Sequence, residues 1–569
     1  MAGLEIRALT IRYPIRSARA LDGIDLTVAP GDVVGVTGRN RAGKSTLALA
    51  AAGFIPRVVR AEVGGDVLVD DVRTRDATRA DLVRRVGIVF STPANQLSAA
   101  RQSVREELAF GLENLGVARS EIDERIERAL AEMGIGDLAE RLPTALSGGE
   151  QQRVAIASML VMGAGILVLD EPTAQLDPAG AEAVAALLLD RARAGTAVLL
   201  AEHRALVLGR TSRCLVLADG RAAALDRPGA VLGSATALLL GGEGPALVRV
   251  AEALGLDPGL GFDPGALADA IGERRLGGAA VRPGGPSAAV TATTPWQSVR
   301  EVRPAAIRIE DLTHRYGALT ALRGVNLEIP PGASVAIVGQ NGSGKTTLAK
   351  HLLGLLRPAE GRVLIDGTDI AGRSIASLAG IVGFVFQDPD DQLFGRSVAR
   401  EVAFGPTNLG VVGAARQRLV EAALAAVGLA SEAATNPYDL DLAARKLVAL
   451  ASVCAMDPAV LVLDEPTTGQ DRPGVARVGA VVDAFAAAGR TVVAITHDME
   501  FAARHFRRVV VMRGGQVLAD GTPREVFAAT NAALLASTGL RLPPIAELGA
   551  RLGLAGAPLS VEALLGALP

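Results

Sequence analysis

Short, almost purely apolar runs recur along the chain, separated by polar or glycine-rich residues. Two of them, residues 33–36 and 335–338, each lead into a glycine-rich loop and then a Leu/Ala-rich segment. Buried strands followed by helical patterns predict a parallel sheet covered by helices. Other runs alternate between apolar and polar positions, at residues 4–13, 24–28, 307–316 and 325–329. Alternation predicts antiparallel strands, so we expect an α/β fold with an antiparallel β subdomain in each half.

A second pattern places apolar residues three and four positions apart, with charged residues between them. These residues are Ile122, Ile126, Ala129, Leu130 and Met133 in the first half, and Leu419, Ala423, Leu424 and Val427 in the second. This spacing predicts one amphipathic helix in each half, and core packing explains both. No window of 18 or more residues is apolar and free of charge, so we expect no membrane-spanning helix.

The chain is a tandem repeat. Asp-Glu-Pro-Thr strings begin at Asp170 and Asp464, and a histidine follows each by 33 residues, at His203 and His497. Ordered motifs in register over a period of about 300 residues indicate duplication of a whole domain. We expect a first domain at 1–230 with a helical extension at 231–273, a flexible linker at 274–304, and a second domain at 305–525 with its extension at 526–569.

Each half has a glycine-rich loop between a strand and a helix, the context that identifies a P-loop. Its backbone N–H groups surround phosphates, its lysine adds a charge at the β- and γ-phosphates, and its hydroxyl joins Mg²⁺. The predicted ATP-binding residues are Gly38, Asn40, Gly43, Lys44, Ser45 and Thr46 in the first half, and Gly339, Asn341, Gly342, Ser343, Gly344, Lys345, Thr346 and Thr347 in the second.

The first loop departs from the second, because Arg41 and Ala42 stand where the second has Gly342 and Ser343. A side chain at the position of Gly342 is costly if the loop needs a positive φ there. Gly43, Lys44 and Ser45 are kept, so we expect the first loop still to bind nucleotide.

The acidic pairs have separable predicted roles. Asp170 and Asp464 end an apolar run and can hold Mg²⁺ or its water, whereas Glu171 and Glu465 are placed to accept a proton from attacking water. His203 and His497 follow a strand that we expect beside the first. Two histidines at matched positions are better explained by γ-phosphate contacts than by core packing.

Further residues complete the predicted sites. Gln387 follows a buried-strand pattern and can touch both metal and water, whereas the first half has the shorter Ser91. Tyr13 and Tyr316 end the first alternating run of each half and can stack on adenine. The predicted catalytic set is Lys345, Gln387, Glu465 and His497, with Glu171 and His203 as a weaker pair; the predicted Mg²⁺ set is Ser45, Asp170, Thr346, Gln387 and Asp464.

Residues 146–157 read Leu-Ser-Gly-Gly-Glu-Gln-Gln-Arg-Val-Ala-Ile-Ala. Ser147, Gly148 and Gly149 offer a hydroxyl and open backbone N–H groups at a helix start, which is an anion-binding arrangement. The counterpart in the second half, at residues 440–451, has Asp441, Leu442 and Ala443 instead.

Composition narrows the classes that fit the chain. Its 569 residues allow several domains, and a net charge of −3 shows no preference for nucleic acid. Two distant cysteines, Cys214 and Cys454, make a disulfide framework or zinc cluster improbable and fit a reducing compartment. The N-terminus has no basic start followed by an apolar run, so we expect no signal peptide.

These motifs together resemble ABC-type ATPase domains, in tandem. The stretches 386–394, 401–405 and 464–471, with echoes at 95–97 and 107–111, resemble the ATPases of energy-coupling-factor (ECF) importers of vitamins and metals, including cobalt-type ones. The resemblance implies two P-loop NTPase domains, each with a RecA-like parallel sheet, an antiparallel β subdomain, a helical subdomain and a small C-terminal helical extension. It also implies ATP and Mg²⁺ as cofactors.

In that family two domains close head to tail, and each ATP lies between the Walker motifs of one and the signature of the other. The resemblance therefore pairs the intact second-half set with Ser147, Gly148 and Gly149, and pairs Arg41, Ala42 and Ser91 with Asp441, Leu442 and Ala443. One site is then expected to hydrolyse ATP and the other mainly to hold nucleotide.

The implied partners are a transmembrane coupling subunit and a substrate-binding membrane subunit, with no nucleic acid, at the cytoplasmic face of the cell membrane. Two alternatives stay open. A tandem ATPase of a sugar-type importer is disfavoured by the Asp-Asp-Gln-Leu-Phe stretch at 390–394. A soluble two-domain ATPase acting on ribosomes or nucleic acid is disfavoured by a linker that is neither helical nor strongly charged. The transported substrate is not encoded in such a chain.

Overall fold

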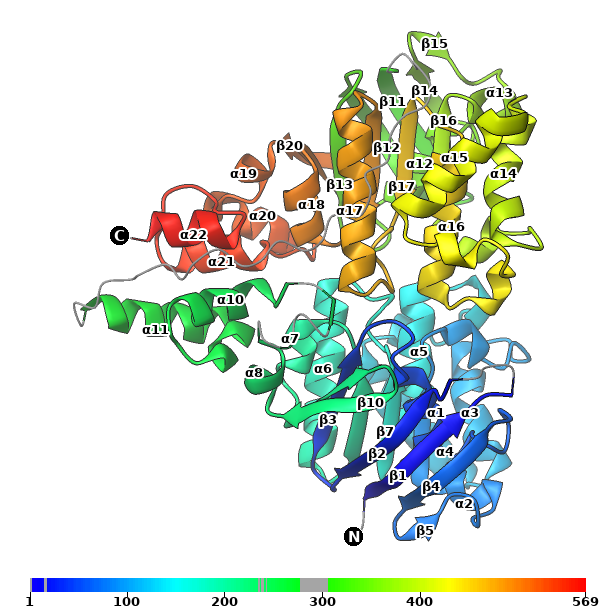
Figure 1. Ribbon diagram of the computed structural model, residues 1–569, viewed down its shortest axis with the longest axis vertical. Helices are drawn as coiled ribbons and strands as arrows, with labels where there is room; N and C mark the ends of the chain where they lie inside the picture. The colour runs from blue at the N-terminus through cyan, green and yellow to red at the C-terminus, as the bar shows by residue number, and fades with distance from the viewer. Residues whose placement is uncertain are drawn as a thin grey trace. The chain divides into compact units, whose positions relative to one another are not determined.

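The computed structural model describes residues 3–14, 18–233, 236, 240–241, 243–276 and 305–568. The chain divides into two compact units, Met1–Asp263 and Pro264–Pro569, which run from blue to green and from green to red in Figure 1. Most of the predicted linker lies outside the described residues, but its first three residues belong to helix α11 (Pro264–Leu276). The finer domain boundaries stay predictions.

The first unit contains two sheets. The antiparallel sheet has the order β2-β1-β4-β5, from β1 (Leu4–Arg12), β2 (Leu21–Val28), β4 (Glu62–Val69) and β5 (Val72–Arg73). The second sheet has the order β10-β9-β3-β8-β7-β6, from β3 (Val33–Gly38), β6 (Val86–Val89), β7 (Ile166–Asp170), β8 (Ala197–Ala201), β9 (Arg213–Ala218) and β10 (Arg221–Asp226). Its strands are parallel except β10, which pairs antiparallel with β9. Both predicted sheet types are confirmed.

The second unit repeats this topology. Its antiparallel sheet has the order β12-β11-β14-β15, from β11 (Ile307–Tyr316), β12 (Leu319–Ile329), β14 (Glu360–Ile365) and β15 (Thr368–Asp369). Its second sheet has the order β16-β17-β18-β13-β19-β20, from β13 (Ser334–Val338), β16 (Val382–Val385), β17 (Val460–Asp464), β18 (Thr491–Thr496), β19 (Arg508–Arg513) and β20 (Gln516–Gly521).

Helices pack against both sheets. The longer ones in the first unit are α1 (Lys44–Ala51), α3 (Val104–Asn114), α4 (Arg119–Met133), α5 (Gly148–Leu160) and α6 (Pro178–Arg193). Their counterparts are α12 (Lys345–Leu352), α14 (Val398–Asn408), α15 (Gly413–Ala426), α16 (Leu442–Cys454) and α17 (Arg472–Ala487), and α16 appears in yellow beside α15 in Figure 1. The apolar residues that predicted α4 and α15 are buried, so this prediction is confirmed.

Shorter helices complete the units. They are α2 (Arg79–Arg85), α7 (Ala205–Leu208), α8 (Pro228–Val231) and α10 (Ala246–Ala253) in the first, and α13 (Ile375–Ala379), α18 (Met499–His505), α19 (Pro523–Val526), α20 (Ala532–Ser537), α21 (Pro544–Arg551) and α22 (Val561–Ala567) in the second. Across the described ranges, none of the helices is long and apolar enough to cross a lipid bilayer.

Every residue of β3, β7, β8, β13, β17 and β18 is buried. Strands covered on both faces read as continuous apolar runs rather than alternating ones, which is why the sequence showed them that way. The carboxyl ends of these parallel strands meet at one edge of each sheet, where ligands bind in open α/β folds.

Candidate nucleotide-binding and hydrolysis sites

Four motifs of each half meet at one sheet edge. In the first unit β3, β8, β7 and β6 are successive neighbours and lead into the P-loop, His203, the acidic pair and Ser91, respectively. In the second unit β13, β18, β17 and β16 do the same for the P-loop, His497, the acidic pair and Gln387. The motifs that are far apart in sequence are therefore brought together within each half.

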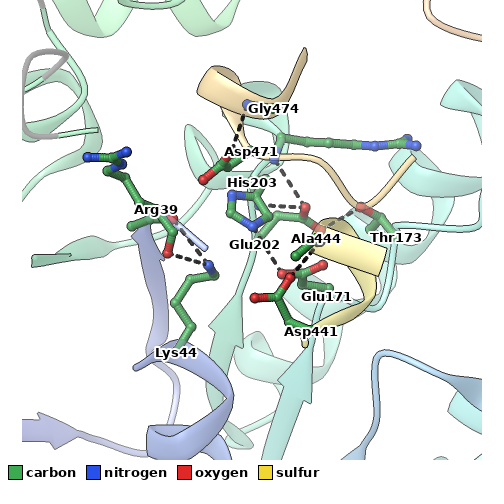
Figure 2. Close-up of polar contacts among 12 residues, drawn as sticks. Arg39, Lys44, Glu171, Thr173, Glu202, His203, Asp441, Ala444, Asp471 and Gly474 are labelled. Carbon is green, nitrogen blue, oxygen red and sulfur yellow. Dashed lines mark hydrogen bonds and ion pairs between the residues drawn. The ribbon is translucent and has the colours of Figure 1, made fainter. Parts of the chain in front are cut away.

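The P-loops place their lysines in the same way. Lys345 is buried, and its Nζ donates to the carbonyls of Gly339 (2.7 Å) and Gln340 (2.9 Å). Lys44 Nζ donates to the carbonyls of Gly38 (3.1 Å) and Arg39 (3.2 Å), as Figure 2 shows for the Arg39 contact. Each ammonium thus lies at the mouth of a ring of backbone groups, where a phosphate would sit.

The first loop adopts the second loop's backbone despite its substitution. Gly342 has φ 78°, and Arg41 has φ 68°, so the arginine occupies the left-handed region that favours glycine. Non-glycine residues pay about 1–2 kcal/mol there. A Cβ built on Gly342 meets nothing within 4 Å, so the cost is conformational rather than steric.

The acidic pair and the histidine form the same group in both halves. His497 Nδ1 lies 2.8 Å from Glu465 Oε2, and His203 Nε2 lies 3.0 Å from Glu171 Oε1. Both glutamates have a positive φ, 48° and 51°. Such strain concentrates where a side chain must be aimed at a reacting group.

The electrostatics separate the two acids of each pair. Burial, together with repulsion from Glu465, raises the pKa of Asp464 to about 6. Burial would also raise the pKa of Glu465, but the neighbouring His497 outweighs it and the pKa is lowered. The same opposition raises the pKa of Asp170 and lowers that of Glu171 beside His203. A bound cation would therefore stabilise the charged form of each buried aspartate. Each glutamate is already held as an anion by its histidine.

The residues fit a Mg²⁺ ion. Thr346 Oγ1 donates to Asp464 Oδ1 at 3.3 Å, so a hydroxyl and a carboxylate already lie together at the end of the P-loop. Hard oxygen donors of this kind, one or two from the protein with the rest from phosphates and water, are typical of Mg²⁺. Among the described residues no cluster of three or more His, Cys, Asp or Glu forms an all-protein metal cage.

The two glutamine-loop positions differ in exposure. Gln387 is exposed after β16, whereas Ser91 is partly buried after β6. Gln96 and Gln392, five residues further along, turn inward. Gln96 Nε2 donates to Ala155 O at 2.8 Å, and Gln392 Oε1 accepts from Phe386 N at 3.3 Å. These two side chains therefore fix the conformation of the loops.

The two tyrosines are held differently. Tyr13 is partly buried, and its hydroxyl lies 3.1 Å from Thr46 Oγ1 on α1. Tyr316 is 47% exposed, and its ring packs edge-on against His314 at 4.6 Å between centroids. Of the two tyrosines, Tyr316 is the more exposed.

The Leu-Ser-Gly-Gly stretch opens helix α5, as predicted. Ser147 is the N-cap and forms a capping box with Glu150, whose carboxylate accepts from Ser147 N and from its hydroxyl, both at 2.8 Å. Asp441 is the N-cap of α16 without such a box, and its carboxylate accepts from Ala444 N at 2.8 Å, a contact drawn in Figure 2. Helix initiation is therefore kept in the second half although the serine is lost.

Local packing explains how the second half tolerates a side chain at the position of Gly148. A Cβ on Gly148 would lie 2.1 Å from Gln175 Oε1. In the second half Leu442 replaces Gly148, and Gly469 replaces Gln175. The larger side chain lies in the loop after the acidic pair in the first half, and at the helix start in the second half.

Sequence reasoning missed Glu202. It is 2% exposed, accepts from His203 N at 2.7 Å, and contacts Thr173 Oγ1 (Figure 2). The second half has Thr496 at this position. The first site therefore carries an additional buried carboxyl behind its histidine. A position-by-position comparison of the halves would have revealed it.

A strand–P-loop–helix followed by a buried acidic pair and a histidine, all at the carboxyl edge of a parallel sheet, defines a P-loop nucleotide hydrolase in each half. The model of one family, ABC transporter, matches residues 21–174 and 322–468. The chain belongs to the ABC transporter family and carries two of its ATPase domains.

Relatives match the sequence over nearly the full chain. A "Putative ABC transporter ATP-binding protein" of Methanosarcina acetivorans is 37% identical over 95% of this chain and 89% of its own length. A protein of the same description from Streptomyces avermitilis is 35% identical over 92% of this chain and 94% of its own length. Among solved structures, cbiO1 from Clostridium perfringens, part of the ABC transporter complex cbiONQ, is 36% identical over 42% of this chain and 96% of its own, with a TM-score of 0.37.

Proposed function

We propose that this chain is the ATP-hydrolysing subunit of an ECF-type importer of a vitamin or metal ion, and that only one of its two sites turns over efficiently. The Walker motifs of the second half (Lys345, Gln387, Glu465 and His497) act with Ser147, Gly148 and Gly149 of the first half. The first-half motifs act with Asp441, Leu442 and Ala443 and mainly hold nucleotide.

One observation supports the unequal turnover of the two sites. The departures lie in different halves, at Arg41, Ala42 and Ser91 and at Asp441, Leu442 and Ala443. The head-to-tail pairing of ABC domains assigns all of them to one composite site and leaves the other complete. Asp441 brings a carboxylate toward a γ-phosphate where Ser147 offers a hydroxyl, and like charges oppose closure there. Loss of one preorganised donor costs about 10²–10³-fold in rate.

The chemistry assigned to the second half follows from its contacts. Glu465, held as an anion by His497, accepts the proton of the attacking water. Lys345 places positive charge at the phosphates, and Thr346 and Asp464 hold the metal. When bound, Mg²⁺ neutralises charge that develops on the transferred phosphoryl group.

ABC ATPase domains of transporters pair with each other and work with transmembrane subunits. We propose that this chain docks on such a subunit through the surface after its glutamine loops, near Asp388, Asp390 and Asp391. Phe394 and Phe404 support this assignment, because they are 59% and 48% exposed and pack against each other at 4.6 Å between centroids. An exposed apolar pair at this surface suits the apolar face of an amphipathic coupling helix. The chain would then be peripheral, at the cytoplasmic face of the cell membrane.

The composite-site proposal predicts that Glu465 and Glu171 contribute unequally to the rate of ATP hydrolysis. Changing Glu465→Gln should reduce ATP hydrolysis by the assembled complex by about 10²-fold or more, because the general base is lost. Glu171→Gln, the same change at the matched position, should have a much smaller effect. Steady-state ATPase assays of both variants test this, and an equal loss in both would contradict it. Co-purification with a membrane coupling subunit tests the importer assignment separately.

A further inference from the structure

Lys446 is a buried cation beside the acidic pair of the second half. It lies on α16, the helix that has lost the Ser-Gly-Gly start, and only 7% of the residue is exposed. Its Nζ donates to the backbone carbonyl of Glu465 at 3.4 Å. Glu465, Asp388 and Asp464 each act on its ammonium group electrostatically. The lysine therefore faces the reacting end of its own half.

The first half shows what packing alone requires at this position. Gln152 is the matched residue on α5, five positions after the helix cap as Lys446 is, and it is also completely buried. A neutral side chain of similar length thus fills the space. Burying an ammonium group instead is costly unless nearby charges compensate. Burial accordingly lowers the pKa of Lys446 to about 8, even though the three carboxylates oppose this.

Neighbouring positions have changed together with Lys446. Arg445 Nη1 lies 2.7 and 2.9 Å from the carboxylate oxygens of Asp390 in the glutamine loop. The first half has Gln151 and Ala94 at these two positions, and Thr92 where the second has Asp388. The second half thus differs from the first by two basic and two acidic side chains. Arg445 faces Asp390, and Lys446 faces Asp388.

A third contact ties the same helix to the loop after the acidic pair. Gln470 Nε2 donates to Ala443 O at 2.9 Å, inside the protein. The first half has Leu176 in place of Gln470, and a leucine side chain cannot donate a hydrogen bond. The first turns of α16 are therefore joined by polar contacts to the glutamine loop and to the acidic strand end of the same half.

We propose that Lys446 is a positioning residue for hydrolysis in the second half, and that α16, having lost its signature, supports the catalytic loops of its own domain. The ammonium group donates to the Glu465 carbonyl and so adds a polar contact to the strand end that carries the catalytic glutamate. Its charge also offsets the repulsion between Asp464 and Glu465. This inference rests on the proposed function, because it assumes that the second-half Walker motifs hydrolyse ATP.

The test replaces the lysine in the full-length chain. Lys446→Gln installs the first-half residue, and Lys446→Met removes the charge at nearly constant length. Both should lower kcat for ATP by about 10–100-fold, the scale expected when a catalytic group is misplaced. KM for ATP should change little, since Lys446 does not touch the predicted phosphate-binding loop. Lys446→Arg should restore part of kcat, because it restores the charge.

Two observations separate this role from packing. Thermal unfolding should show that each variant is folded, and Lys446→Arg should keep more of the wild-type kcat than Lys446→Met does. The inference is overturned if folded Lys446→Gln or Lys446→Met keeps the wild-type kcat, or if folded Lys446→Arg loses as much as Lys446→Met.

The outcome also distinguishes the two proposals. If Glu465→Gln abolishes hydrolysis while the Lys446 variants are unaffected, only the role of Lys446 fails. If Glu465→Gln has no effect, the assignment of hydrolysis to the second half fails first.

Discussion

At the scale of single residues, backbone strain marks the same place in both halves. Glu171 and Glu465 hold left-handed conformations, each directly after a fully buried strand that ends in aspartate. The backbone N–H of each glutamate bonds to the carbonyl of the neighbouring strand, at Ala201 or Ile495, with both distances 2.9 Å. The sheet therefore enforces a conformation that costs about 1–3 kcal/mol and aims each carboxylate at its histidine.

A buried histidine near the second P-loop predicts a pH-dependent stability. His351 on α12 is 1% exposed, its Nδ1 lies 2.8 Å from Thr347 O, and its ring packs against His314. Burial lowers its pKa below the ordinary 6.5, opposed by its backbone contacts. The unfolded chain then binds more protons just below pH 6.5, so this contribution to stability is present above that pH and is lost as pH falls.

Replacing His351→Asn removes that contribution. The variant should show a weaker fall in unfolding temperature between about one pH unit above and one below 6.5 than the wild type does. Differential scanning calorimetry across this range measures the difference. Parallel profiles for the two proteins would show that His351 does not titrate differently in the folded state.

At the scale of elements, changes at the start of the signature helix α5 should affect ATP hydrolysis without affecting the stability of the fold. Ser147→Asp combined with Glu150→Ala copies Asp441 and Ala444, which cap α16 without help from a glutamate. Asp and Ser are equally good caps, so the free energy of unfolding should change by less than about 1 kcal/mol. ATP hydrolysis should fall by about 10²–10³-fold, because the hydroxyl proposed to serve the second-half site is gone.

The reciprocal variant is the matched control. Asp441→Ser with Ala444→Glu should also fold normally and should change hydrolysis little, because Leu442, Ser91 and Arg41 still differ. Denaturant unfolding and steady-state ATPase rates of both double variants decide the matter. Equal rates in the two would remove the functional distinction between α5 and α16.

The elements of each half follow from sequence because they are locally encoded. The apolar runs suffice to predict the buried strands and, with the glycine-rich loops that follow them, the P-loops. The helical spacing of apolar residues suffices to predict α4. Glu202, Lys446 and Gln175 were not predicted, since their importance depends on partners far away in the sequence: the Thr173 hydroxyl, a strand-end carbonyl and a glycine on another helix. Each differs from its counterpart in the other half, so the tandem repeat contained a signal that motif matching ignores.

At the scale of the whole molecule, duplication followed by divergence has produced two halves with one topology and different polar chemistry. The sheets have the same strand order, and the acidic pair follows the same buried strand in each. The differences include charge at several positions: Arg41, Glu202, Asp441, Arg445 and Lys446, for example, have uncharged counterparts. A shared scaffold with unequal polar chemistry is what the proposed mechanism, with hydrolysis at one of two sites, requires.

That asymmetry predicts how much bound nucleotide survives a single turnover. The full-length chain, loaded with Mg-ATP and freed of excess ligand, should bind one nucleotide at each of its two family domains. After one turnover the bound pool should contain ATP and ADP in about equal amounts, because the first-half site lacks several groups that stabilise developing charge. Glu465→Gln should keep both nucleotides as ATP. Rapid gel filtration followed by nucleotide analysis measures the ratio, and conversion of both ATP molecules at one rate would contradict the asymmetric mechanism.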